Sequence, residues 1–535
     1  MTTISPAAAD EGAAANAGPA ASVWRVEPFR DGTPEEFARL RSALERAGYT
    51  EPALCARFGI AQMHEFLQAR EGREESLEPT DAQAVLARLF LDAEPLEWRV
   101  VRALLPADAV AAIEALGLLH DMGERGELCA ATVLLYPTDG LYIVSDRNAD
   151  PDALAVPPPA DIVYPAITRN THRFMSTLPR TPCDSFLELC SGTGVAALAA
   201  AAGFARRAWA VDITGRATRF ARFNAALNGL ANVEALEGDL FEPVRGLTFD
   251  RIAAHPPYMP ALRQEYVFRD GGEDGEQITR RIIAGLPEYL RPGGLFVCSC
   301  MATDRGPDAP LEARVREMLG AQQEEFDVVV AQAQTFDPTG YYVQLAVKGS
   351  GRFGPVETRH QLFKRLGITR LVFGTVMIQR HAAGARRPAF TARRQLGLET
   401  AAPQFEWLLR WATAEAATGY EALANALLDA RPRANPGVEL RMTYRLERGD
   451  GPAWTAGKNW VAVELPFAVE AECPFWVPAL LERADGSATF RELLESLKRT
   501  GLVPEEASEA EFGPMALRFV MQGFLDVAEV PAHSG

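Results

Sequence analysis

Three acidic side chains accompany short apolar strands in the sequence, and their spacing is suited to the binding of a nucleoside. Glu188 lies in SFLEL, Asp212 ends AWAVD, and Asp239 lies in EGDLF. The turn CSGTG contains Gly192 and Gly194, where backbone amides can approach a ligand because no Cβ atom blocks them. An acid roughly 20 residues beyond such a turn is placed to bind ribose hydroxyls. Since ligands of open α/β sheets bind at the carboxyl ends of strands, these residues predict one nucleoside pocket.

The acid before the turn indicates the charge of the ligand. A dinucleotide-binding loop reads GxGxxG and presents a helix N-terminus to a pyrophosphate. Here Glu188 precedes the loop, and a carboxylate suits a cation better than a phosphate. S-adenosylmethionine carries an ammonium and a sulfonium group, so electrostatics favour it as the cofactor. The alternative interpretation is that the acids are ordinary strand-end caps.

A rigid corner follows the predicted strand FDRIAA. It reads HPPYMP, with His255 before Pro256 and Pro257, and with Tyr258 after them. Two consecutive prolines cannot continue a helix or a central strand, so the chain must turn here. The imidazole offers a hydrogen-bond acceptor and the phenol ring offers a stacking surface. The corner is therefore a candidate for the reacting face of a site.

A parallel sheet is needed to bring these residues to one edge. Residues 184–348 alternate short apolar strands with helical patterns, which is typical of a doubly wound parallel sheet. We therefore expect an α/β fold.

The motifs ELCSGTG, VDIT, GDLF and HPPY resemble those of class I S-adenosylmethionine-dependent methyltransferases. They are most similar to bacterial glutamine-amide N-methyltransferases, which act on release factors and a ribosomal protein and carry NPPY at the corner. The family's GGxDG and LxPGG motifs are matched in order by residues 269–294, RDGGEDGEQITRRIIAGLPEYLRPGG. The resemblance covers roughly residues 160–348 and implies a Rossmann-like sheet of seven strands.

The resemblance also implies a role for each motif. Glu188 and the loop after it would hold the methionine end of the cofactor, and Asp212 would bind the ribose. Asp239 and Leu240 would border the adenine. The implied cofactor-site residues are Glu188, Cys190, Ser191, Gly192, Gly194, Asp212, Ile213, Asn224, Gly238, Asp239, Leu240 and His255. The implied catalytic residues are His255, Pro256, Pro257 and Tyr258.

Two positions depart from the family pattern. Cys190 stands where the first loop residue is usually glycine, although some ribosomal-protein methyltransferases have cysteine there. His255 stands in place of asparagine. In the family, oxygen acceptors at the corner hold the N–H groups of a planar nitrogen, which frees its lone pair for attack. Our hypothesis is that His255 accepts one N–H group or acts as a base, and the alternative is that it only shapes the pocket.

Five further residues are weaker candidates. Three aromatic side chains could wall the substrate pocket, namely Tyr164, His172 and Tyr266. Two acids, Glu273 and Asp274, lie in a glycine-rich loop that could close over the acceptor, or they are solvated loop acids. The histidines and cysteines show no metal-ligand spacing, so we expect no metal site.

Composition limits the class of protein. The chain has 535 residues, which implies several domains. No apolar run reaches the roughly 18 residues of a membrane span, and the N-terminus lacks the features of a signal peptide. The seven cysteines contain no CxxC pair, which fits a reducing cytoplasm.

The charge is uneven along the chain. The net charge of −17 disfavours non-specific nucleic-acid binding. The segment from Lys348 to Arg394, however, has eleven Lys/Arg and one acid, Glu357. This basic segment could hold an acidic partner or an RNA backbone, or its arginines could balance acidic neighbours.

The expected domains follow from these patterns. They are a disordered tail at 1–22, a winged-helix-like domain at 23–140, the methyltransferase domain at 141–348, an accessory region at 349–470 and a second winged-helix-like module at 471–535. Residues 31–140 hold twenty acids and ten Lys/Arg, the wrong sign for contact with phosphates, so we expect a protein-docking or packing role for this domain.

The sequence therefore predicts a cytoplasmic N-methyltransferase that uses S-adenosylmethionine and acts on a nitrogen of a protein or peptide. The alternatives are a base amine of RNA or DNA, a small-molecule acceptor, or a catalytically silent protein that only binds the cofactor.

Overall fold

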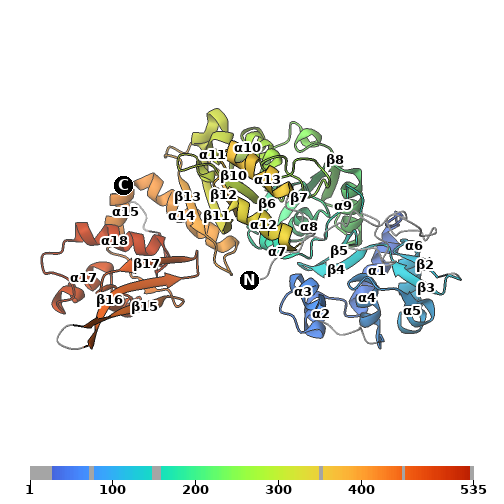
Figure 1. Ribbon diagram of the computed structural model, residues 1–535, viewed down its shortest axis with the longest axis horizontal. Helices are drawn as coiled ribbons and strands as arrows, with labels where there is room; N and C mark the ends of the chain where they lie inside the picture. Colours follow the sequence, from blue (N-terminus) through green and yellow to red (C-terminus); the bar gives the residue numbers. More distant parts are fainter. Residues whose placement is uncertain are drawn as a thin grey trace. The chain divides into compact units, whose positions relative to one another are not determined.

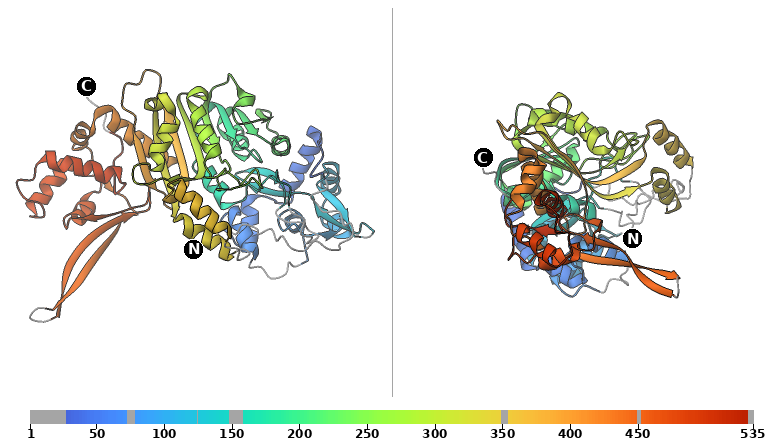
Figure 2. Two further views of the ribbon diagram at one scale, coloured as in Figure 1. Left: turned by 45° about the horizontal axis from the view of Figure 1, so that its top comes forward. Right: turned by 90° about the vertical axis from the view of Figure 1, so that its left-hand side faces the viewer.

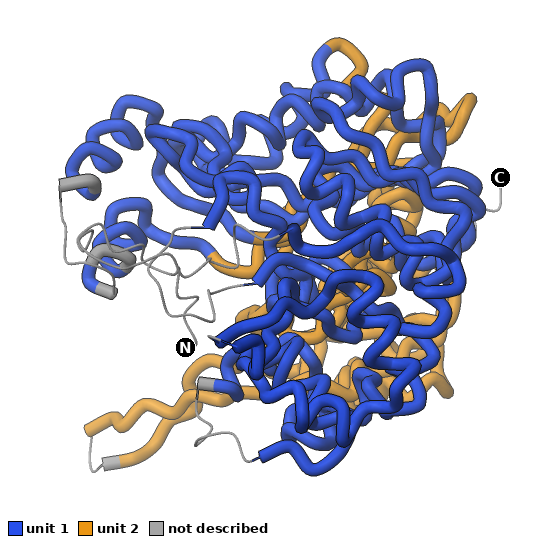
Figure 3. Tube along the Cα trace, turned by 90° about the vertical axis from the view of Figure 1, so that its right-hand side faces the viewer, with its two compact units in different colours: residues 1–175, 180–320, 335–373 blue, residues 176–179, 321–334, 374–535 orange. Residues whose placement is uncertain are grey.

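The computed structural model describes residues 27–71, 78–123, 125–147, 158–348, 354–448 and 452–530, and the tail expected at 1–22 lies outside them. Its contacts divide the chain into two compact units, coloured in Figure 3. Unit 1 comprises residues 1–175, 180–320 and 335–373, and unit 2 comprises residues 176–179, 321–334 and 374–535.

The N-terminal part of unit 1 contains helices followed by a small antiparallel sheet. The helices are α1 (Pro34–Arg46), α2 (Glu51–Phe58), α3 (Phe66–Glu71), α4 (Ala82–Phe90), α5 (Trp98–Leu104) and α6 (Ala107–Ala115). The sheet has the order β1-β3-β2 and consists of β1 (Leu96–Glu97), β2 (Leu119–Met122) and β3 (Leu128–Ala131). Thr33 and Glu36 form a capping box at the start of α1, because each side chain bonds to the other's backbone N–H.

A second hairpin connects this part to a helix of the large α/β segment. Strands β4 (Leu134–Thr138) and β5 (Leu141–Ser145) pair antiparallel, so the domain boundary expected between residues 140 and 141 falls inside a hairpin. Helix α9 (Gly215–Leu227) presents the side-chain amide of Asn224 to the backbone N–H and C=O of Val144, at 2.8 and 3.0 Å. Asn228 does the same for Tyr142, at 2.9 and 2.7 Å. The two amides continue the hydrogen bonding of β5 much as a neighbouring strand would.

The largest sheet confirms the predicted α/β class. It has eight strands, in the order β13-β11-β12-β10-β9-β6-β7-β8, one more than the seven expected. Their bounds are β6 (Cys183–Leu189), β7 (Ala205–Asp212), β8 (Val233–Glu237), β9 (Phe249–Ala254), β10 (Leu290–Asp304), β11 (Phe326–Phe336), β12 (Arg370–Arg380) and β13 (Thr391–Gln395). The extra strand is β13, which runs parallel to β11. Its sequence TARRQ lacks the apolar run of a buried strand, so no strand was expected there.

The strands of unit 1 from β10 to β8 are all parallel. Phe186, Leu187 and Leu189 of β6 are fully buried, as both faces of such a sheet are covered by helices. The covering and connecting helices are α7 (Arg169–Ser176), α8 (Val195–Gly203), α9, α10 (Gln277–Tyr289) and α11 (Leu311–Met318) (Figure 1). Two more helices, α12 (Pro338–Lys348) and α13 (Gly354–Arg365), are inserted between β11 and β12.

Unit 2 ends in one small α+β core. Its helices are α14 (Ala402–Thr418), α15 (Tyr420–Leu427), α16 (Val477–Arg483), α17 (Phe490–Arg499) and α18 (Glu509–Met521). Its strands are β14 (Arg433–Ala434), β15 (Glu439–Arg448), β16 (Pro452–Val463), β17 (Val469–Cys473) and β18 (Leu525–Asp526). Figure 2 shows β15 and β16 as a long two-stranded ribbon.

The domain boundary expected at residues 470–471 does not separate two cores. It cuts β17, and buried residues from both sides of it, such as Leu427, Val461 and Leu517, pack in the same cluster. In the part of the chain that the structure describes, no helix has the length and apolar character needed to cross a membrane.

Candidate active site

The three acids predicted from the sequence gather around Cys190. Burial raises the pKa of its thiol, and the nearby carboxylates of Asp212, Asp239 and Glu188 raise it further. These acids lie at or near the carboxyl ends of the neighbouring strands β6, β7 and β8, so the parallel sheet places them at one edge.

The loop after β6 has the backbone of a ligand-binding turn. Cys190, Gly192 and Gly194 have φ angles of 54°, 53° and 78°, a region that favours glycine. The backbone N–H of Gly192 donates to Oδ2 of Asp212 at 2.9 Å. A Cβ atom built on Gly192 would meet nothing within 4 Å, so the space beside this turn is open.

Asp212 is held from its other side by Thr214. The backbone N–H and the hydroxyl of Thr214 donate to Oδ1 at 3.1 and 3.2 Å. Burial raises the pKa of Asp212, although the hydrogen bonds from Gly192 and Thr214 oppose the shift. Beside it, Ile213 exposes 54% of its surface, which leaves an apolar side chain at the end of β7.

Glu188 is buried beneath the loop. Its residue is only 3% exposed, and its Oε2 accepts from the backbone N–H of Ala197 at 2.8 Å, in the first turn of α8. Burial raises the pKa of Glu188 to about 8, against the hydrogen bonds from Ala197 and Ala196. This carboxyl therefore stabilises the start of α8 as well as contributing to the acidic cluster.

Asp239 lies at the third strand end. Its Oδ2 accepts from Arg281 of α10 at 2.7 Å, and one third of the side chain is exposed. Leu240 follows in the left-handed region with φ 52° and is buried. The backbone N–H of Gly238 donates to the carbonyl of Asp212 at 2.9 Å, which ties the ends of β7 and β8 together.

Asn224 and Ser191 have different surroundings. Asn224 is fully buried, and its amide bonds to Val144 and to the carbonyl of Thr193 at 3.0 Å, so in this structure it positions the loop. A direct contact of Asn224 with the cofactor stays a prediction. Ser191 is 5% exposed, and no hydrogen-bond partner reaches its Oγ within the described residues.

The proline corner begins directly after β9. The His255 ring lies 5.4 Å from Phe174 and 5.9 Å from Tyr258, between centroids. Burial lowers the pKa of His255 to about 4, so the ring is neutral at pH 7. His255 is partly exposed, and no hydrogen bond from the described residues reaches its nitrogens.

Tyr258 is held by residues that the sequence did not reveal. Its hydroxyl accepts from Nδ2 of Asn170 at 3.1 Å, and its ring lies 5.8 Å from that of Phe373. Burial raises the pKa of its phenol. Asn170, Phe174 and Phe373 are distant from the corner in sequence, and no spacing marks them.

The glycine-rich loop packs on the corner. A Cβ atom on Gly271 would lie 2.6 Å from the carbonyl oxygen of Pro257, and one on Gly275 would collide with the carbonyl oxygen of Tyr258. Only glycine fits this close approach of two backbones. The loop and the corner therefore position one another.

The acids of this loop have separate partners. Asp274 accepts from Arg280 at 2.6 Å and from Arg305 at 2.5 Å, and these bonds lower its pKa despite its burial. Glu273 is exposed and lies 3.7 Å from Arg365.

Glu276, which the sequence did not indicate, anchors the loop. It is 1% exposed and accepts from the backbone N–H and the hydroxyl of Thr303 at 2.7 and 2.6 Å. Arg314, also buried, donates to both of its oxygens. This buried ion pair joins the start of α10 to β10 and α11.

Two of the three predicted wall residues are near each other. Tyr164 stacks on Phe268 at 4.9 Å, and Tyr266 lies 5.8 Å from the same ring. His172 instead stacks on His64 at 4.3 Å. From the insertion, Tyr341 adds a hydroxyl 3.9 Å from the sulfur of Met259.

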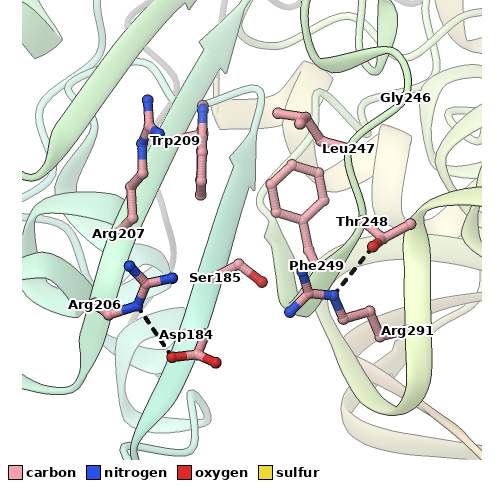
Figure 4. A pocket seen from close by; sticks show the side chains of 10 residues that line it. All are labelled: Asp184, Ser185, Arg206, Arg207, Trp209, Gly246, Leu247, Thr248, Phe249 and Arg291. Carbon is pink, nitrogen blue, oxygen red and sulfur yellow. Dashed lines mark hydrogen bonds and ion pairs between the residues drawn. The ribbon is translucent and has the colours of Figure 1, made fainter.

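A separate hollow lies at the opposite edge of the sheet, where β6, β7 and β9 begin (Figure 4). Its arginines have local partners: Arg206 bonds to Asp184 at 3.2 Å and Arg291 to Thr248 at 3.1 Å. It contains none of the predicted site residues. Among the described residues, no group of three or more His, Cys, Asp or Glu could hold a metal ion.

Comparison with known proteins gives a family for the central segment. Residues 166–330 match the methyltransferase small domain. A protein of Methanocaldococcus jannaschii that bears the name protein N5-glutamine methyltransferase is 41% identical over 115 residues, which cover 20% of this chain and 57% of the relative.

Two bacterial relatives match the same kind of segment. The release factor glutamine methyltransferase of Moorella thermoacetica is 36% identical over 23% of this chain and 49% of the relative. The ribosomal protein uL3 glutamine methyltransferase of Bradyrhizobium diazoefficiens is 34% identical over 24% of this chain and 46% of the relative. The chain thus spans about half the length of these relatives. The motif resemblance is confirmed: residues 166–330 form a methyltransferase domain related to the protein glutamine methyltransferases.

Proposed function

We propose that this chain transfers the methyl group of S-adenosylmethionine to a nitrogen of a protein or peptide in the cytoplasm. Relatives that match this segment are named release factor glutamine methyltransferase and ribosomal protein uL3 glutamine methyltransferase. The observation that carries the proposal is at the corner. There a neutral, partly exposed imidazole, which accepts no hydrogen bond from the described residues, lies beside the ring of Tyr258.

The residues at the strand ends fit the cofactor. Asp212 and Asp239 offer carboxylate oxygens of the kind that bind ribose hydroxyls and cationic groups. Open space lies beside Gly192, and the exposed Ile213 offers an apolar surface for a purine ring. When bound, S-adenosylmethionine supplies a methyl group on a sulfonium, which is attacked by a nucleophile.

The corner would orient the nucleophile. The ring of Tyr258 offers a face on which a planar amide can stack, and Asn170 holds its hydroxyl. The neutral His255 can accept one N–H of that amide, which turns the nitrogen lone pair toward its target. With a pKa of about 4, only about one imidazole in a thousand is protonated at pH 7. This favours a role for His255 as a hydrogen-bond acceptor over a role as a general base.

The basic segment supports a protein acceptor rather than a nucleic acid. Arg380 bonds to Glu325 at 2.8 Å, and Arg387 bonds to both oxygens of the buried Asp327. Arginines that balance acidic neighbours are less available to phosphates. For this reason a base amine of RNA ranks second, after a protein nitrogen, as the methyl acceptor.

The test is a labelling experiment. A cell extract is incubated with this protein and cofactor labelled on the methyl group, and the products are digested separately with protease and nuclease. We expect label that only protease releases, and methylated glutamine after proteolysis to single residues. Label released only by nuclease, or cofactor binding without transfer to any extract component, would refute the proposal. A parallel reaction with His255→Ala controls for other methyltransferases in the extract.

A further inference from the structure

The ribbon of β15 and β16 exposes an apolar face. Leu440, Met442, Tyr444 and Leu446 alternate along β15, and each exposes between 41% and 55% of its surface. Alternate residues of a strand point to the same face of the sheet, so these side chains lie along one face. The pairing with β16 shifts register between Met442 and Tyr444, where the Thr443 hydroxyl bonds to the backbone of Lys458. Trp454 pairs with Leu446 across the ribbon and is 68% exposed.

The ribbon also has a free edge. The sheet has the order β15-β16-β17, so β15 is bonded on one side only (Figure 2). An edge of ten exposed residues with an apolar face is a template for pairing with another strand. Three of the five apolar residues, Leu440, Met442 and Leu446, are aliphatic and give nucleic-acid bases no ring to stack on, which favours a polypeptide.

The sequence of β15 is complementary to itself in one register. In a two-fold antiparallel pair, a residue that faces a second residue is itself faced by that second residue in the other copy. With the two-fold axis at Tyr444, Arg441 faces Glu447 twice, Met442 faces Leu446 twice, and Leu440 faces Arg448 at the ends of the ladder. In its own chain Arg441 also bonds to Glu439 at 3.0 Å and to Glu470 at 3.2 Å, so the contact with Glu447 would add to these ion pairs. Opposite charges and apolar pairs directly across a ladder are both stabilising.

The neighbouring registers are unfavourable. With the axis at Thr443, Arg441 would face Arg445 and Glu439 would face Glu447. With the axis at Arg445, this arginine would face its own copy. A shift that pairs odd with even residues would set the apolar face against the charged face.

We propose that two copies of this chain associate through β15, paired antiparallel about Tyr444. The two ribbons then form one continuous sheet, in which each free edge is covered by the other. The proposal concerns only the small α+β core of unit 2 and does not depend on the proposed methyl transfer.

Sedimentation velocity of the full chain from about 1 to about 100 µM tests the association. We expect a monomer–dimer equilibrium within that range. Glu447→Arg sets like charges together at both Arg441 positions, so the dissociation constant should rise roughly tenfold or more. Glu447 makes no ion pair in its own chain among the described residues, which makes this the cleaner single substitution.

A charge swap distinguishes pairing from a general loss of fold. Arg441→Glu should weaken the dimer as well, and Arg441→Glu with Glu447→Arg should restore it. Arg445→Glu, on the same strand but facing Thr443, is the matched control and should retain the dimer. Circular dichroism checks that each variant is folded.

Three outcomes would overturn the proposal. They are a chain that stays monomeric across the range, a dimer unaffected by Glu447→Arg, and a double variant that behaves like the single ones. Binding of a fluorescent single-stranded RNA by a strictly monomeric chain, abolished by Trp454→Ala, would assign the face to nucleic acid instead.

Discussion

The ring centroids of His255 and Tyr258, which flank the two prolines of the corner, lie 5.9 Å apart, and the ring planes meet at an angle of only 21°. Phe174 packs on one ring and Phe373 on the other. The pair therefore presents two aromatic rings whose orientations are determined by the surrounding core rather than by solvent.

Replacing His255 should reduce methyl transfer without affecting the cofactor. His255→Ala removes the hydrogen-bond acceptor, and we expect kcat to fall by about 100-fold or more. His255→Asn should recover part of that loss, because an amide oxygen also accepts from an N–H group. Calorimetry should find the same affinity for S-adenosylmethionine in all three proteins. Unchanged turnover in His255→Ala would remove this residue from the mechanism.

The activity should tolerate mild acid. The pKa of His255 is about 4, and a protonated imidazole has no acceptor nitrogen, so its contribution to kcat/KM should be lost only as the pH falls through about 4. The measurement is a profile of kcat/KM from pH 4 to 8, with circular dichroism to follow the fold. An acid limb with a midpoint near the unperturbed value of about 6.5, absent from His255→Asn, would contradict the neutral, partly buried ring.

Binding of the cofactor should strengthen as the pH rises toward about 8. The raised pKa of Glu188 means that the carboxyl is largely protonated at pH 7, whereas a cationic ligand favours the ionised form. Affinity should therefore increase with pH below about 8, with up to about one proton released per ligand. Isothermal titration calorimetry in two buffers of different ionisation enthalpy measures the number of protons released on binding. Glu188→Gln should remove the pH dependence, and the surface substitution Glu234→Gln should preserve it.

The glycine-rich loop provides a test of positioning. Gly271→Ala places a methyl group against the carbonyl oxygen of Pro257, so we expect the corner to shift and kcat to fall at least about tenfold. Affinity for the cofactor should be retained because the strand-end acids are not touched. Gly203→Ala, where an added Cβ atom meets nothing within 4 Å, is the matched control. Equal activity of the two variants would show that the loop does not set the corner.

Glu276 should matter for stability. It shares a buried ion pair with Arg314, and removing one member of such a pair costs about 3 kcal/mol because the other charge stays buried. Glu276→Gln should lower the midpoint temperature of the first unfolding transition in differential scanning calorimetry by several degrees. Glu273→Gln, which alters an exposed ion pair in the same loop, should leave this midpoint temperature unchanged. Equal melting temperatures would contradict an anchoring role.

Residue types and periodicity predicted the sheet and the acids at its edge. Strand periodicity places Glu188 and Asp212 where parallel strands end, and parallel topology then brings those ends together. The same reasoning could not find Asn170 or Phe373, because a contact with Tyr258 made by distant segments leaves no local pattern. It also gave no sign that Asn224 would be fully buried and bonded to β5, since spacing does not report burial.

Domain limits were harder to predict than the strands of the large sheet. A change of composition suggested a boundary at 140–141, but backbone pairing between β4 and β5 runs across it. The boundary at 470–471 was placed at the start of a clear helical pattern, yet Val461 and Leu517 share one cluster. Sequence patterns show where one kind of element gives way to another, but a hydrophobic core can include residues from both sides of that point.

The amide pairs that Asn224 and Asn228 make with β5 bear on how such chains can be recombined. The stretch that matches the family, residues 166–330, contains α9 but not the strand that its amides bind. Transplanted alone, it would lose the bonds of both amides to β5 and expose the face of α9 that β5 covers. A fragment that keeps these bonds must therefore begin upstream of β4, and one limited to the matching stretch should be less stable than the longer piece.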